Sequence, residues 1–188
     1  SSNLAGYYGV YNPGYTNLNL HNITFTGSTS SIYLSDSTEN FTVTSSTMNS
    51  INHTSSGTVS TMNISLNTIN TGLFLLFDTV VPDNNILTIK NNVVYKGFNL
   101  TNNSGIAQIT NNNFDYGAGY GGSFIYINNN GRNNFSSNQA GSTFFLGNSN
   151  NYNNVTNNLI YPTDRETSGL TMSNTNYSNI ISNNLPHG

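Results

Sequence analysis

Short runs of alternating apolar and polar residues extend along the whole chain. From Leu18 onward they place two or three apolar side chains at every second position, as in Ile23-Thr-Phe25, Phe41-Thr-Val43 and Ile64-Ser-Leu66. A period of two predicts strands that bury one face. No stretch keeps the spacing of an amphipathic helix, and Gly, Asn, Ser and Thr form helices poorly. We therefore expect an all-β protein.

A longer repeat runs through residues 86–185, where apolar runs are followed by asparagine. Five apolar residues end these runs at steps of 20, 18, 19 and 26 residues, each with asparagine two positions later: Ile89, Ile109, Ile127, Leu146 and Met172. Self-similarity at such a period is typical of stacked structural units. We expect the following asparagines, beginning with Asn91, Asn111 and Asn129, to share one column of the stack.

Two architectures fit many short strands, a parallel β-solenoid and an antiparallel β-sandwich that polymerises by donating an N-terminal strand. In a solenoid, equivalent residues of neighbouring coils lie ~4.8 Å apart, so asparagines can form a hydrogen-bonded ladder. Asparagine also tolerates the left-handed conformation of sharp corners, which would explain Asn-Asn pairs at 91–92, 111–112, 133–134, 157–158 and 183–184. A sandwich gives no reason for this register, so we expect the solenoid.

The spacing of apolar residues and asparagines in residues 146–159 and 172–185 resembles right-handed parallel β-helix proteins. That superfamily includes pectate-lyase-like enzymes, phage tailspikes and bacterial surface adhesins. The resemblance covers residues 86–185 well and residues 18–85 loosely, and in character the chain is closer to tailspikes and surface adhesins or filaments than to the enzymes. It implies a right-handed parallel β-helix and no particular chemistry, because the motif reflects coil geometry.

The first 16 residues do not carry the repeat, so the chain divides into a leader, 1–16, and a single β-helical domain, 17–188. Four tyrosines with glycine and proline make an extended leader rather than a helix. It is either a cap over the first coil or an arm that reaches a neighbouring subunit, since an extended segment can add a strand to an exposed edge.

The composition excludes several classes of protein. The 188 residues include 39 asparagines, only 6% are charged, and the net charge is -3 with four cationic side chains. Binding to a nucleic-acid backbone requires clustered Lys and Arg, and a membrane helix requires ~18 apolar residues, so we expect neither partner. The absence of cysteine excludes disulfides and thiolate metal sites. The uncharged surface, and a start at Ser1 without a signal peptide, favour a processed extracellular chain at a cell or virion surface.

Asn-X-Ser/Thr sequons are frequent and are candidate N-glycosylation sites of a secreted protein. They begin at Asn22, Asn40, Asn52, Asn63, Asn99, Asn102, Asn134, Asn154 and Asn176. The alternative is chance, because asparagine, serine and threonine are so abundant here.

Charged residues offer one compact candidate for catalysis. Polysaccharide hydrolysis needs two nearby carboxyl groups, and lyase chemistry needs a base with a cation. Asp164, Arg165 and Glu166 meet this description within the longest insertion, although a solvated loop tip would look the same. Asp78 and Asp83 could flank a calcium loop or an ordinary turn. The three histidines, at positions 21, 53 and 187, lack ligand spacing, and we expect them at the surface or in turns.

Tyrosines are the second set of candidate functional residues. Tyr116, Tyr120 and Tyr126 surround a glycine-rich turn, and Tyr161 precedes the charged cluster. Exposed tyrosines pack on sugar rings while their hydroxyl groups bond to sugar hydroxyls. We therefore expect these four residues to bind glycan.

Together these observations favour a non-enzymatic extracellular protein with a structural or adhesive role. We expect it to be a subunit of a fibre, filament or spike that self-associates, because an open solenoid leaves two sheet edges unpaired. Its expected ligand is a surface polysaccharide, with no cofactor and no metal ion. The alternative function is a polysaccharide lyase or hydrolase of the β-helix type.

Overall fold

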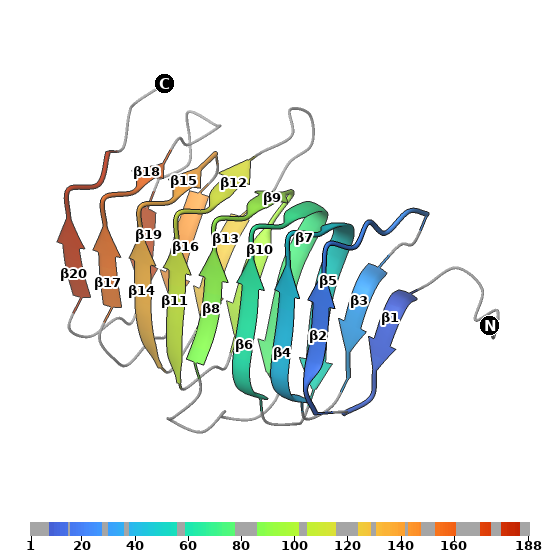
Figure 1. Ribbon diagram of the computed structural model, residues 1–188. Coiled ribbons are helices and arrows are strands. Elements are labelled where there is room, and N and C mark those ends of the chain that lie inside the picture. The colour runs from blue at the N-terminus through green and yellow to red at the C-terminus, as the bar shows by residue number, and fades with distance from the viewer. Residues whose placement is uncertain are drawn as a thin grey trace.

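The protein, as a computed structural model, is a parallel β-solenoid (Figure 1). The structure describes residues 8–14, 16–27, 30–35, 38–55, 59–77, 86–101, 105–115, 124–128, 131–141, 143–147, 153–160, 170–173 and 178–184. Within these ranges every regular element is a strand and every strand pair is parallel. The predicted all-β solenoid is confirmed, and the antiparallel sandwich is wrong.

The strands of the solenoid form three faces. The front layer in Figure 1 is an eight-stranded sheet of β2 (Leu18–His21), β4 (Thr38–Thr44), β6 (Val59–Ser65), β8 (Ile86–Lys90), β11 (Ile106–Thr110), β14 (Arg132–Ser136), β17 (Asn153–Thr156) and β20 (Ser178–Ile181). The layer behind it, the long face, holds β1 (Tyr8–Asn12), β3 (Ser30–Leu34), β5 (Thr47–Ser55), β7 (Thr68–Phe77), β10 (Phe98–Thr101), β13 (Phe124–Asn128), β16 (Thr143–Gly147) and β19 (Leu170–Ser173). A short face connects them through β9 (Val93–Tyr95), β12 (Asn113–Asp115), β15 (Gln139–Ala140) and β18 (Leu159–Ile160).

The leader contributes the first strand of the long face. Within it, β1 pairs in parallel with β3, and Tyr11 lies in register with Tyr33. Residues 1–7 lie outside the described part of the chain. The role of the leader as cap or arm stays a prediction.

The core consists of columns of like residues that repeat from coil to coil. Val43, Ile64, Ile89, Ile109, Phe135 and Val155 form one such column on the eight-stranded sheet. Three rings, Phe98, Phe114 and Phe135, come from the three faces and meet inside, with centroid distances of 5.4 and 6.0 Å. These contacts bury the apolar side of every face, which is the main favourable contribution to folding.

One histidine belongs to this core. His53 has no exposed surface and lies in register between Leu34 and Leu75. The expectation of a surface or turn position is therefore wrong for His53, because the period of two places it on the inward side of β5. His21 is exposed, and His187 lies outside the described residues.

A column of buried asparagines runs along the corner between the eight-stranded sheet and the short face. At each step the backbone N–H and the Nδ2 of one asparagine donate to Oδ1 of the next, over 2.9–3.1 Å. Nδ2 also donates to a carbonyl oxygen of the preceding coil, as Asn112 does to Ile89 at 2.9 Å. We call this column the amide ladder; it contains Asn67, Asn92, Asn112, Asn138, Asn158 and Asn183.

The predicted ladder exists, but the predicted alignment was partly wrong. Asn91 and Asn111 do share a column, where they are exposed corner residues with φ of 56° and 55°, and the next residue in sequence forms the ladder. Ile109 pairs with Phe135, whereas Ile127 lies in the other sheet. Two strands of the same coil, β11 and β13, are both followed by the pattern's asparagine. The step from Ile109 to Ile127 therefore lies within one coil, and the prediction treated it as a step between coils.

The remaining predicted asparagine positions divide in the same way. Asn129 follows β13 of the long face and lies outside the described residues. The pair 133–134 lies within β14 rather than at a corner. Asn157 is a corner residue with φ of 56°, and at the last corner Ser182 takes this conformation while Asn183 joins the ladder.

Removing one amide from the ladder should destabilise the solenoid. In Asn112→Ala, the Ile89 carbonyl oxygen and the Asn92 backbone N–H lose buried partners, so we expect the free energy of unfolding to fall by about 2–4 kcal/mol. Asn111→Gly is the matched control, because glycine adopts the left-handed conformation freely. Urea denaturation followed by circular dichroism compares the variants. Unchanged stability of Asn112→Ala would show that the ladder contributes little.

Relieving backbone strain at one corner should stabilise the protein. Leu66 is 59% exposed and has φ of 60°, in the column that Asn91 continues. A side chain with Cβ pays about 1–2 kcal/mol in this conformation, and asparagine tolerates it better. We expect Leu66→Asn to raise the free energy of unfolding by about 1 kcal/mol and Asn91→Leu to lower it similarly. Thermal melts of both variants test this, and shifts of the same sign would contradict it.

Candidate functional site

The outer surface of the long face carries an unusual column of side chains. Because the neighbouring positions in each strand face the core, these positions lie on the outward side of the sheet. We call this the outer aromatic column; in register it contains Tyr11, Tyr33, Asn52, Phe74, Asn99, Tyr126, Phe145 and Thr171. Five of its eight positions are aromatic, and none is charged.

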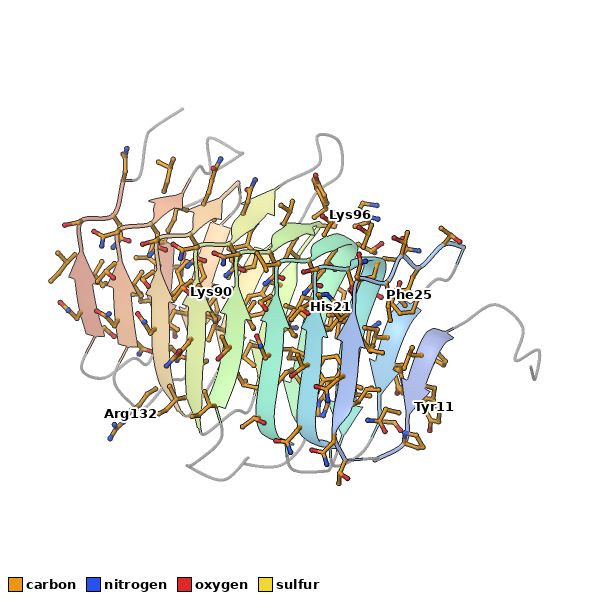
Figure 2. The ribbon with its side chains drawn as sticks, in the orientation of Figure 1. Tyr11, His21, Phe25, Lys90, Lys96 and Arg132 are labelled. Atoms are coloured by element: carbon orange, nitrogen blue, oxygen red, sulfur yellow. The ribbon has the colours of Figure 1, made fainter. Side chains whose placement is uncertain are left out.

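Three tyrosines gather where this column begins. Tyr8 and Tyr11 come from β1 and are 46% and 53% exposed, and Tyr33 comes from β3. Ring centroids lie 4.6 Å apart for Tyr8 and Tyr33, 5.9 Å for Tyr11 and Tyr33, and 6.1 Å for Tyr8 and Tyr11. Ser35 Oγ donates a hydrogen bond of 3.0 Å to the Tyr11 hydroxyl oxygen. This tyrosine cluster therefore offers solvent an ordered aromatic surface with hydroxyl groups, near the N-terminal end of the stack (Figure 2).

Two phenylalanines further along the column lie against glycines of their own strands. A Cβ atom built on Gly72 would lie 2.7 Å from two ring atoms of Phe74, and one built on Gly147 would collide with the ring of Phe145. Each ring therefore covers the bare backbone two residues away and lies along the sheet surface. Both rings are only half-buried. The glycines thus leave room for these two rings to lie against the sheet.

The amides of the column are not equivalent. Asn52 Nδ2 donates to Ser50 Oγ at 3.0 Å. In contrast, Asn99 Oδ1 is buried without a hydrogen-bond partner, the one such side-chain atom among the residues described. Buried polar atoms without partners are rare in folded proteins and call for an explanation. Asn99 lies in register between Phe74 and Tyr126.

The outer surface of the eight-stranded sheet is polar, and its outward Asn, Ser and Thr residues account for many of the sequons. Asn154 Nδ2 donates to Asn134 Oδ1, and Asn179 Nδ2 to Asn154 Oδ1, both at 3.1 Å. Residues two positions apart in a strand share a face, and the two defining residues of a sequon have the same spacing. A column of outward Asn next to a column of outward Ser and Thr therefore creates sequons, as Asn63 and Ser65 do. Of the nine, those at Asn102 and Asn176 lie outside the described residues. Glycosylation stays a prediction.

Most of the predicted chemical residues fall outside the described part of the chain. These are Asp164, Arg165 and Glu166, the tyrosines Tyr116, Tyr120 and Tyr161, and Asp78 and Asp83. Tyr126 lies in β13 in the outer aromatic column, and its side chain is not described. The hypotheses of catalysis, glycan binding and calcium binding at these residues therefore stay predictions.

Charged and metal-binding groups are sparse where the structure is described. Lys90, Lys96 and Arg132 lie well apart (Figure 2). No three His, Cys, Asp or Glu side chains of the described ranges gather as a metal site would require. The same ranges contain no helix long and apolar enough to cross a membrane.

Sequence reasoning missed the tyrosine cluster, although a signal was present. Val10-Tyr-Asn12 and Ile32-Tyr-Leu34 share an apolar-Tyr pattern at a distance of 22 residues, close to one coil. Treating the leader as separate from the repeat hid this match. The parallel pairing of β1 with β3 is what brings these tyrosines together.

Comparisons with known proteins leave the surface itself as the guide to function. The chain matches no protein-family model, no curated protein and no solved structure. Its parallel β-solenoid is consistent with a β-helix fold. Membership of the pectate-lyase-like superfamily stays an interpretation of that architecture.

Proposed function

We propose that the chain is an extracellular structural or adhesive surface protein. In this proposal it is a subunit of a fibre, filament or spike, as tailspikes and surface adhesins are, and it binds surface polysaccharide without cleaving it. The observation that carries the proposal is the exposed tyrosine cluster of Tyr8, Tyr11 and Tyr33. Such rings present an apolar face to the C–H groups of a sugar and hydroxyls to its polar edge.

The scaffold beneath the cluster supports binding to an extended polymer. Strand pairing of β1 with β3 and of β3 with β5 fixes the first coils against each other, and the amide ladder holds the later coils in the same way, so the rings are ordered before a ligand arrives. Preorganised side chains lose less conformational entropy on binding than mobile ones. A repeating polymer also suits a surface that repeats along the stack.

Self-association belongs to the same proposal. At the C-terminal edge of the eight-stranded sheet, β20 leaves Ile180 45% and Ile181 52% exposed. An edge strand has unpaired N–H and C=O groups that can accept a strand from another chain. Apolar side chains beside such an edge would strengthen that contact, so we place an interface between copies of the chain there.

Loss of the tyrosine rings should weaken binding to polysaccharide. We expect Tyr11→Ala and Tyr33→Ala each to lower affinity about tenfold, because one ring contact contributes about 1 kcal/mol or more. Tyr95→Ala is the matched control, since Tyr95 lies on the short face. Affinity gel electrophoresis with embedded polysaccharides measures the effect. Equal retardation of all three variants would remove the cluster from the proposal.

A charge at the exposed edge should disrupt assembly. We expect Ile180→Lys to shift the protein toward smaller particles in multi-angle light scattering, because lysine at an edge opposes strand addition. Ile86→Lys is the control: Ile86 is 41% exposed but lies in β8, which has paired strands on both sides. A monomeric parent protein at micromolar concentration would contradict self-association.

A further inference from the structure

The surface around Phe74 has the parts of a second ligand subsite. Two atoms of its ring lie over the backbone of Gly72, and the side chain is only half-buried, so part of the ring is open to solvent. Asn52 and Asn99 flank it in the neighbouring strands, each one strand spacing away, or ~4.8 Å. The two amides therefore lie two strand spacings apart along the stack, ~9.6 Å, with the aromatic ring midway between them.

The unpaired oxygen of Asn99 is an independent sign that this surface lacks a partner. The amide of Asn52 is held by Ser50, whereas Asn99 Oδ1 has no donor within reach among the described residues, and Phe74 beside it has none to offer. Asn99 as a whole is only half-buried, so binding would require its side chain to rotate and turn the oxygen outward. A ligand hydroxyl would then satisfy the oxygen that the protein leaves unpaired.

The charge of the surroundings indicates which ligand fits. The outer aromatic column contains no charged residue; of the described cations, Lys90 and Arg132 belong to the other sheet and Lys96 lies at the corner before β10. Acidic polysaccharides would require cationic partners, which this column lacks. Uncharged hydroxyls and apolar ring faces match its amides and aromatic rings.

We propose that Phe74, Asn52 and Asn99 form a subsite for one ring of a neutral polysaccharide, whose chain runs along the stack from the tyrosine cluster. The apolar face of the sugar ring packs on Phe74, and hydroxyls at its two ends bond to the two amides. This inference rests on the proposed function, because it names the ligand class and a second contact point of the same column.

Affinity electrophoresis of the full chain tests the subsite. The chain is produced in a bacterial host that does not N-glycosylate, because Asn52 and Asn99 both begin sequons. The probes are the neutral polymers dextran, amylose, galactomannan and xyloglucan, with the acidic polygalacturonate and alginate for comparison. We expect a neutral polymer to retard the protein more than either acidic one, and Phe74→Ala and Asn99→Val to weaken that binding about tenfold.

Thermal melts separate a binding role from a structural one. Asn99→Val removes an unpaired buried oxygen and introduces a good strand former, so its melting temperature should equal or exceed that of the parent while binding falls. Tyr95→Ala again serves as the control for binding. Parental affinity in both Phe74→Ala and Asn99→Val, together with weak binding in Tyr33→Ala, would overturn the subsite and leave the proposed function standing. No retardation by any polymer would overturn both.

Discussion

The buried amide ladder is the interaction on which the rest of the solenoid depends. Each ladder asparagine before Asn183 has its backbone N–H and Nδ2 satisfied by the Oδ1 of the following coil. In the interior these groups cannot bond to water instead, so a coil out of register would leave several buried groups unpaired. The ladder thus sets the register of every coil it joins, a role that apolar contacts alone fill poorly because they are not directional.

The end of the ladder shows why asparagine is needed within it. Ser46 occupies the position before Asn67, and its Oγ accepts from the Ile23 backbone N–H while donating to the Thr44 carbonyl oxygen. Its own N–H donates to Asn67 Oδ1. A hydroxyl can therefore serve at one end, but it lacks the second N–H with which each asparagine reaches both the preceding coil and the next amide. Asparagine is the short side chain that provides both an acceptor and two donors.

The sequence predicted the strands and the ladder better than the surface. A period of two and recurrent asparagine pairs follow directly from one buried face and one tight corner, so both are local signals. The column to which Ile127 belongs is not a local signal, because strands of the eight-stranded sheet and of the long face can end alike, as β11 and β13 do, and only the topology distinguishes them. The prediction for His53 was wrong because it relied on the polar character of the side chain. His53 lies two positions after Ile51 in β5, so both face the core and both are fully buried. The tyrosine cluster likewise depends on the pairing of two strands that the sequence alone did not align.

The same stacking that builds the core also determines what kind of site the exterior can offer. Parallel strands in register turn each outward position into a column, so chemistry is repeated along the stack rather than gathered from distant loops. Such columns suit a ligand that is itself a repeat, and they suit poorly a reaction that needs several different groups at one point. The glycines beneath Phe74 and Phe145 make room for large outward rings in such a column while the strands remain paired. An unpaired buried oxygen in such a column costs stability without strengthening the fold, and this is the reason for our proposal that a ligand hydroxyl pairs with Asn99 Oδ1.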